Sequence, residues 1–250
     1  MLSSSSLTSA VSDIIIRPIG IIHSCYPEKF GIPRQPGLVK SATARLEMLA
    51  PFNRLEMFKG LERFSHIWLQ FLFHETVPEG WKRTIRPPSL GGRERVGIFA
   101  SRSPHRPNHL GLSAVRLVRI VREGRQVFLD LAEIDLLDRT PVLDIKPYIP
   151  YSDRLDDAGD GYTKPFEGPA VEVVFSTEAI DFCACYERKT GRKLRELVFE
   201  TLSLDPRPAS HRPGMGEYGM LFWDINVRWR VEQGVFQVIG CERTDREAGE

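Results

Sequence analysis

Short apolar segments separated by loops rich in proline and glycine constrain the fold of this chain more than any other feature. The segments are rich in β-branched and aromatic residues, which favour strands. We predict strands over residues 14–23, 44–49, 64–74, 96–100, 112–121, 126–131 and 142–146. The loops are uneven in length, and no regular alternation of strand and helix is visible. This pattern predicts a mainly β region, either a barrel or a sandwich.

Two local patterns refine this prediction. Leu55, Phe58 and Leu61 recur at helical spacing, which predicts a helix over residues 53–63 with Asn53 as its N-cap. Glu123-Gly124-Arg125 predicts a hairpin turn between the strands on either side. The aromatic run 64–74 is read as a buried strand, although periodicity alone also allows a helix.

The composition of the chain changes after a polar segment rich in glycine and aspartate, residues 151–168, which we interpret as a linker. Beyond it we predict strands over 170–175, 218–229 and 235–241, and helices over 178–189 and 193–202. The chain is therefore divided into a disordered tail (1–13), a β domain (14–160) and a small α+β C-terminal domain (161–250).

Composition bounds the class of protein. The 250 residues are 42% hydrophobic and 27% charged, as in soluble globular proteins. Lysine and arginine total 34 against 33 acidic residues, so net charge does not indicate a nucleic-acid partner. We expect no secretory signal, no membrane span and no metal site. The four cysteines do not have the pattern of a disulfide scaffold, which indicates a cytosolic protein with reduced thiols.

A proline-braced basic segment stands out within this neutral chain. Residues 80–106 contain seven basic side chains and one acidic one, with Trp81 and Phe99 between them. Pro104 and Pro107 stiffen its end and keep it out of helix and sheet. Such a segment either binds phosphates or an anionic ligand, or is a solvated surface loop.

Two further segments carry candidate chemistry. The first, PRQPGLVKS at residues 33–41, could wrap a small ligand with backbone groups, because Gly37 allows close approach. The second, IDLLDRTPVLDIKPY at residues 134–148, contains Asp135, Asp138 and Asp144. A carboxylate there could accept ribose hydroxyl groups or take a proton, and ordinary turn chemistry is the alternative.

These motifs occur together in an order that resembles the TsaA-like family of tRNA N6-methyladenosine methyltransferases, the TrmO group. The resemblance covers nearly everything after residue 13 and rests on residues 33–41, 58–69, 86–113, 134–148, 205–210 and 224–229. The departures are His105, where the family more usually has phenylalanine or asparagine, His109 in place of a proline, Ser210 in place of a tyrosine, and Arg139 in place of a glycine. Because arginine does not adopt positive φ as freely as glycine, the sequence leaves the backbone conformation of the turn at Arg139 open.

The resemblance implies a TsaA-like β-barrel that uses S-adenosylmethionine, with a small α+β C-terminal domain. It implies methylation of N6 of threonylcarbamoyl-adenosine at position 37, next to the anticodon of a threonine tRNA. It also implies a cytoplasmic homodimer with the cofactor near the subunit interface. A non-catalytic RNA-binding β-barrel, with bases stacked on Trp81, is the alternative. A methyltransferase for small molecules is less favoured, because it does not need the C-terminal motifs.

The resemblance also implies roles for individual residues. The candidate bases are Asp138 and Asp144. The expected cofactor-binding residues are Gln35, Pro36, Gly37, His74, Glu75, Arg102, Leu112, Asp135, Asp138, Thr140 and Pro141. The expected tRNA-binding residues are Arg83, Arg86, Arg93, Arg95, Arg106, Arg207 and Arg212.

Overall fold

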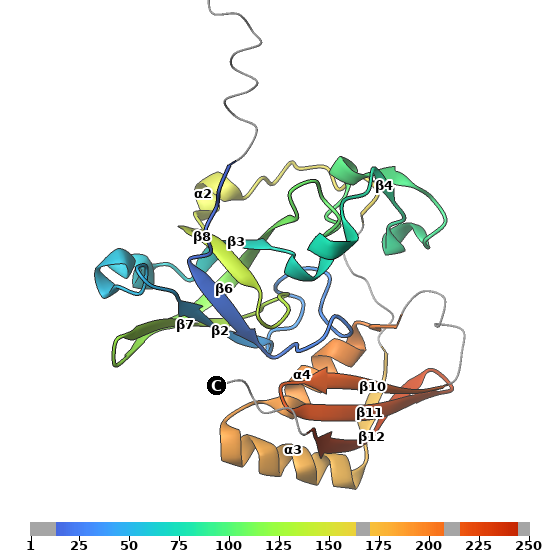
Figure 1. Cartoon of the computed structure of the whole chain (residues 1–250). Coiled ribbons are helices and arrows are strands. Elements are labelled where there is room, and N and C mark those ends of the chain that lie inside the picture. Colours follow the sequence, from blue (N-terminus) through green and yellow to red (C-terminus); the bar gives the residue numbers. More distant parts are fainter. Residues whose placement is uncertain (1–13, 164–170, 208–215, 245–250) are drawn as a thin grey trace, which may run out of the picture.

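A closed β-barrel forms the N-terminal part of the molecule, and an α+β domain packs beneath it in the view of Figure 1. The computed structural model describes residues 14–163, 171–207 and 216–244. The predicted mainly β class, with a barrel and a small α+β domain, is confirmed.

The barrel consists of six antiparallel strands in the order β1-β2-β7-β6-β3-β8. Inward-facing apolar residues alternate with more exposed ones along them, as in β7 with Val127, Leu129 and Leu131 buried. This alternation fills the barrel with side chains. The strands are β1 (Gly20–Ser24), β2 (Thr43–Met48), β3 (His66–Leu72), β6 (Leu110–Glu123), β7 (Gln126–Ala132) and β8 (Pro141–Pro147).

Short elements decorate the barrel. A two-stranded ribbon, β4 (Thr84–Ile85) with β5 (Val96–Gly97), lies within the basic segment. The 3₁₀ helices are η1 (Leu55–Phe58), η2 (Leu61–Arg63), η3 (His74–Glu79), η4 (Pro88–Leu90) and η5 (Ile98–Ala100), and the short helix α2 is Pro150–Asp153.

The C-terminal domain packs two helices on a four-stranded sheet of order β10-β11-β12-β9. The first helix begins at Ser176, whose hydroxyl accepts a hydrogen bond from the Ala179 N–H, and ends at Gly191 in the left-handed conformation. The elements are β9 (Val173–Phe175), α3 (Thr177–Thr190), α4 (Leu194–Ser203), β10 (Gly216–Phe222), β11 (Ile225–Glu232) and β12 (Val235–Arg243).

The two domains share one apolar core. The Tyr26 and Phe222 rings meet across the boundary with centroids 6.0 Å apart. The Trp223 N–H donates to the Cys25 carbonyl at 3.0 Å. The C-terminal domain therefore holds the loop that follows β1, which is one wall of the site described below.

Several predicted boundaries are wrong for identifiable reasons. The strand over 14–23 is shorter, because pairing of β1 begins at Gly20, after the donor-lacking Pro18. The strand over 96–100 has only two paired residues before η5. The strand over 218–229 is two strands, β10 and β11, joined by a tight turn in which Trp223 has φ of 51°. The predicted turn at Gly124 is confirmed.

The predicted helix over 53–63 is also wrong. Gly60, with φ of 92°, separates two single 3₁₀ turns, η1 and η2. Asn53 caps neither of them, because its amide group donates to the Arg125 carbonyl and to Gln126 on the β6–β7 hairpin.

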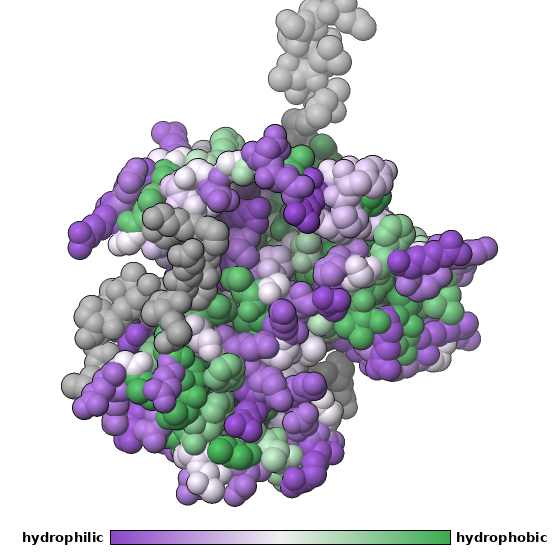
Figure 2. Space-filling view, turned by 180° about the vertical axis from the view of Figure 1, so that it is seen from behind, coloured by the Kyte–Doolittle hydropathy of each residue, from purple (hydrophilic) through white to green (hydrophobic). Residues whose placement is uncertain are grey.

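No helix in the described part of the chain is long and apolar enough to cross a membrane. Figure 2 shows the opposite face, where hydrophobic patches on both domains are broken up by hydrophilic residues. The apolar surface exposed on this face therefore forms separate patches and no single continuous area.

Candidate active site

A pocket of about 600 Å³ lies where loops from distant parts of the chain meet at one end of β3 and β6. The loop after β1, the start of η3, the end of the basic segment and the β7–β8 loop all contribute to it. Seven of the residues expected to bind the cofactor line this pocket together: Gln35, His74, Glu75, Arg102, Leu112, Asp135 and Thr140.

The loop after β1 and the basic segment are joined at the pocket. The Arg102 guanidinium donates a hydrogen bond to the Gln35 side-chain carbonyl. The same loop is held to the barrel by the Gly37 N–H, which donates to the Glu133 carbonyl at 2.9 Å. Gly37 has φ of 80°, so this turn uses its conformational freedom.

The β7–β8 loop is fixed to β1 by a set of hydrogen bonds. The Asp138 carboxylate accepts from the Ser24 N–H at 2.8 Å, and the Ser24 hydroxyl donates to the Leu136 carbonyl at 2.7 Å. The Arg139 N–H donates to the Ile22 carbonyl at 2.7 Å. Arg139 has φ of 61°, so it adopts the left-handed conformation that glycine reaches more freely.

Asp135 is a half-buried acidic side chain of this pocket. Its Oδ1 atom is buried and has no hydrogen-bond partner within the described residues. Burial raises the pKa of Asp135 to about 6, opposed by a hydrogen bond from the Ser113 side chain and by the charge of Arg102. A carboxyl group with such a pKa changes protonation close to neutral pH.

The mouth of the pocket is shaped by a second set of local contacts. The Thr76 hydroxyl lies 3.1 Å from Nδ1 of the buried His109, and the same nitrogen lies 3.1 Å from the Pro104 carbonyl oxygen. His109 therefore helps to fix the basic segment against η3. No group of three or more potential metal-ligating side chains is present among the described residues.

Four other residues expected to bind the cofactor do not line the pocket: Pro36, Gly37, Asp138 and Pro141. The Asp138 carboxylate is occupied by the Ser24 N–H, which gives it a structural role in the loop. The candidate base Asp138 thus lies outside the pocket lining and supports the loop that forms the pocket wall.

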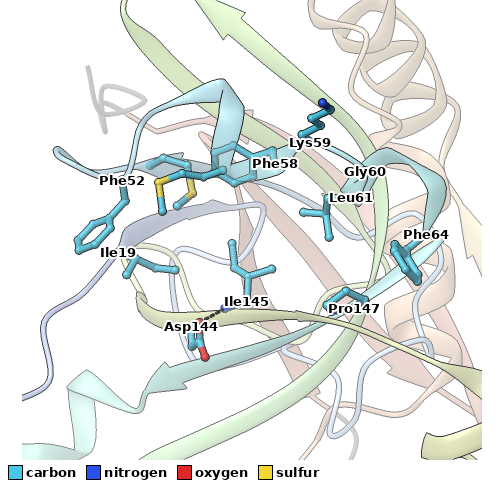
Figure 3. A pocket seen from close by; sticks show the side chains of 12 residues that line it. Ile19, Phe52, Phe58, Lys59, Gly60, Leu61, Phe64, Asp144, Ile145 and Pro147 are labelled. Carbon is cyan, nitrogen blue, oxygen red and sulfur yellow. Dashed lines mark hydrogen bonds between the residues drawn. The ribbon is translucent and has the colours of Figure 1, made fainter.

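Asp144, the other candidate base, belongs to a different pocket of about 530 Å³ beneath η1 and η2. Apolar side chains such as Ile19, Phe58 and Ile145 point into this second pocket in Figure 3. The Asp144 carboxylate points away from them and accepts from the Ile145 N–H at 2.9 Å. This placement separates Asp144 from the loops of the candidate site.

The arginines expected to bind tRNA fall into different environments. Arg83, Arg86, Arg93 and Arg95 are exposed on the basic segment, whereas Arg106 lines the pocket and donates to the Ser101 carbonyl at 2.6 Å. Arg207 is only 6% exposed, and its guanidinium pairs with Asp205 at 2.8 Å and lies over the Phe236 ring. Arg207 therefore lies inside the described part of the C-terminal domain, unlike the exposed arginines of the basic segment. Arg212 lies outside the described residues.

Sequence reasoning missed several residues of the pocket wall. Trp68, Phe71 and Phe73 supply its aromatic surface, and Gly111 and Ser113 approach it from β6. The aromatic run of this segment predicts only a buried strand and does not by itself indicate a ligand pocket. The alternation of β3 offered a signal, because Trp68 sits on the opposite face from the buried Ile67 and Leu69.

Comparisons with known proteins agree with this architecture. The family model of the tRNA-methyltransferase O N-terminal domain matches residues 21–154, and the TrmO C-terminal domain model matches residues 168–244. A tRNA (adenine(37)-N6)-methyltransferase of Escherichia coli K12 is 43% identical over 235 residues, covering 93% of this chain and 99% of that protein. The Pseudomonas aeruginosa protein RcsF, whose name describes an S-adenosylmethionine-dependent methyltransferase, is 45% identical over 86% of this chain and 91% of its own length.

A solved structure shares the fold of this chain. The crystal structure of TrmO from Pseudomonas aeruginosa superposes with a TM-score of 0.76 at 37% identity, covering 92% of this chain and 99% of that one. A human tRNA (adenine(37)-N6)-methyltransferase is 41% identical over 139 residues, which cover 55% of this chain and 30% of that protein.

Proposed function

The chain belongs to the tRNA-methyltransferase O family, and we propose that its substrate is threonylcarbamoyl-adenosine at position 37 of a threonine tRNA. It is an S-adenosylmethionine-dependent tRNA (adenine37-N6)-methyltransferase. The single observation that carries the proposal is the pocket itself, which brings Gln35, Arg102 and Asp135 together from three separate segments. The alternative of a non-catalytic RNA-binding barrel is not retained, because the relatives are methyltransferases.

The residues of the pocket fit S-adenosylmethionine. Aromatic side chains of β3 provide apolar surface for an adenine ring, and the Arg102 guanidinium suits a carboxylate. The Asp135 carboxylate has a buried oxygen without a partner in the described structure, which suits a polar ligand. When bound, the cofactor supplies an electrophilic methyl group on a sulfonium. The pocket residues bind and orient the ligands and exclude water from them.

The threonylcarbamoyl group supports the choice of substrate for a chemical reason. The N6 nitrogen of adenine is a poor nucleophile, because its lone pair is delocalised into the ring. An electron-withdrawing carbamoyl group makes the N6 proton easier to remove. The same substituent carries a carboxylate, which a cationic pocket attracts.

The exposed arginines of the basic segment are proposed to face the tRNA. Arg83, Arg86, Arg93 and Arg95 lie on the segment that also supplies Arg102 to the pocket, and Trp81 and Phe99 are 54% and 79% exposed beside them. Cations and exposed aromatic rings together suit a single-stranded loop, because they bind phosphates and stack on bases.

The proposal includes a homodimer that works in the cytoplasm. Leu110 and Leu112 are 40% and 55% exposed on the pocket wall, a surface that a second subunit could cover. Light scattering coupled to size-exclusion chromatography tests the dimer, and a monomer at micromolar concentration would contradict it.

Mass analysis of tRNA nucleosides tests the substrate. A strain without this gene should lose the N6-methyl form of threonylcarbamoyl-adenosine in threonine tRNA, and the wild-type gene should restore it. Unchanged nucleosides would refute the substrate assignment. Binding of the cofactor is tested separately by thermal unfolding, because a ligand at 100 times its Kd stabilises a protein by about 2.7 kcal/mol.

A further inference from the structure

The described wall of the pocket contains two carboxylate side chains, Glu75 and Asp135. Glu75 is 55% exposed, and its carboxylate lies 4.0 Å from the Lys29 ammonium and 3.8 Å from the His74 ring. Glu75 therefore faces solvent and basic neighbours at the mouth of the pocket. Asp135 differs, because it combines a position in the pocket with a buried oxygen that has no partner.

The surroundings of Asp135 favour uptake of a proton. Desolvation raises its pKa to about 6, which is close to the value that suits a base at neutral pH. Ser113 lies in the same pocket wall as Asp135, and its side chain opposes part of the rise in the pKa. Tyr26 is a titratable group that interacts electrostatically with Asp135. The charged or titratable groups around the pocket are Lys29, Arg34, His74, Glu75, Arg102 and Arg106.

We propose that Asp135 is a catalytic residue, the base that accepts the N6 proton of the adenosine while the methyl group is transferred. This step rests on the proposed function. The nitrogen lone pair forms the bond to the methyl carbon, and the carbon–sulfur bond breaks with its electron pair going to sulfur. The N6 proton moves to the Asp135 carboxylate. The positive charge of the sulfonium and the negative charge of the Asp135 carboxylate are neutralised in the same step, so no further reactant is needed.

Asp135→Asn is the first test, because asparagine keeps the shape of the side chain and cannot accept the proton. Turnover of tRNA that carries threonylcarbamoyl-adenosine should fall by about 10²–10⁴-fold. The Kd for S-adenosylmethionine, measured by calorimetry, should change less than tenfold. The acid limb near pH 6 in the wild-type profile of kcat/KM should disappear from the residual activity.

Asp156→Asn is the matched control, since Asp156 is a surface residue with a side chain that is 77% exposed. It should leave turnover and its pH profile unchanged. Wild-type-like turnover of Asp135→Asn would overturn the proposal, as would a loss of cofactor affinity equal to the loss of rate, which would make Asp135 a cofactor ligand.

Chemical rescue adds an independent readout. In Asp135→Ala, formate should restore activity in proportion to its concentration, because a small carboxylate can occupy the vacated space and take the proton. A lack of rescue in a variant that folds and binds the cofactor would overturn the assignment. Inactivity of the wild-type enzyme on the same tRNA would instead refute the proposed substrate, so the two failures are distinguishable.

Discussion

A carboxyl group without full hydrogen bonding is costly at the scale of one residue. The Asp135 Oδ1 atom is buried without a partner in the described structure, so its ionised form loses solvation that nothing there replaces. The same property that suits the residue for taking up a proton should therefore destabilise the fold at neutral pH. Active sites commonly carry such a conflict between stability and activity.

Asp135→Asn should stabilise the protein at pH 8. The folded-state pKa of about 6 lies above the usual 3.8, so the folded protein binds a proton more readily than the unfolded chain between these values. The free energy of unfolding of the wild type thus falls as the pH rises through this window. Removing the charge should recover up to about 3 kcal/mol at pH 8, measured by urea unfolding.

The pH dependence of this gain separates it from other effects. The gap between Asp135→Asn and the wild type should shrink as the pH falls toward 4, because the wild-type carboxyl group is then neutral. Asp156→Asn, on the surface, should show no such gap. A variant that is less stable than the wild type at pH 8 would contradict the argument.

Sequence patterns indicated which loops form the pocket more clearly than which side chains pair within it. Gln35 and Arg102 sit on proline-braced segments, a local signal for ordered loops, and the structure brings them into contact. The partner of Asp138 is Ser24, 114 positions away, and no local pattern reveals that pairing. The burial of Arg207 under its ion pair is likewise a consequence of folding, which arginine type and loop position do not indicate.

At the scale of elements, the pairing of β3 with β6 builds the pocket wall. Gly111 lies directly opposite Phe71, and the absence of a side chain leaves room for the ring. The Phe71 ring in turn packs edge-on against Phe73, with centroids 5.0 Å apart. One glycine thus sets the position of two aromatic side chains of the pocket.

Gly111→Ala should destabilise the protein and weaken cofactor binding. An added Cβ would lie 2.3 Å from atoms of the Phe71 ring, so the ring must move. Overpacking of this kind costs about 1–3 kcal/mol, measurable by denaturant unfolding. Gly97→Ala is the control, because a Cβ there meets nothing within 4 Å. Equal stability of both variants would refute the role of Gly111.

The basic segment should contribute a salt-dependent part of tRNA binding. Replacing Arg83 and Arg93 with glutamine should weaken binding and reduce the slope of log K against log salt by roughly 1.4–1.8 if each contacts one phosphate. The control replaces Arg119 and Arg154, two exposed arginines paired with carboxylates elsewhere on the molecule. An unchanged slope for the first pair would show that the segment is only solvated surface.

Strands were more predictable than the elements between them. The apolar segments of β2, β7 and β8 were recognised to within a residue or two, because burial dictates their composition. The helix over 53–63 failed because helical spacing also suits two 3₁₀ turns, and Gly60 breaks them apart. The sequence does not indicate the tight turn after β10, because tryptophan is not among the residues that favour turns, although Trp223 adopts positive φ.

At the scale of the whole molecule, one core links two family domains. Glu200 on α4 accepts hydrogen bonds from the Ser41 N–H at 2.8 Å and from its hydroxyl at 2.7 Å. Ser41 ends the loop that contains Gln35, so the C-terminal domain supports the pocket from a distance. The need for such support gives a structural reason for keeping both domains together.

Glu200→Ala should lower the free energy of unfolding by about 1.5–3 kcal/mol, the range for hydrogen bonds to a charged group. Unfolding should remain a single transition, because the apolar core is continuous. Glu196→Ala, on an exposed position of the same helix, should cost less than about 1 kcal/mol. Calorimetry measures the loss of unfolding free energy in each variant. Equal losses in Glu200→Ala and Glu196→Ala would contradict this role of Glu200.

The bond between Arg102 and Gln35 has a consequence for ligand choice. The acceptor is the uncharged amide of Gln35. When a carboxylate arrives, Arg102 therefore exchanges this weaker acceptor for a stronger, ionised one. Neutral solutes gain nothing by the same exchange. We therefore expect a ligand carboxylate to replace Gln35 on Arg102 more readily than a neutral solute does, so that selection for anions takes place on entry to the pocket.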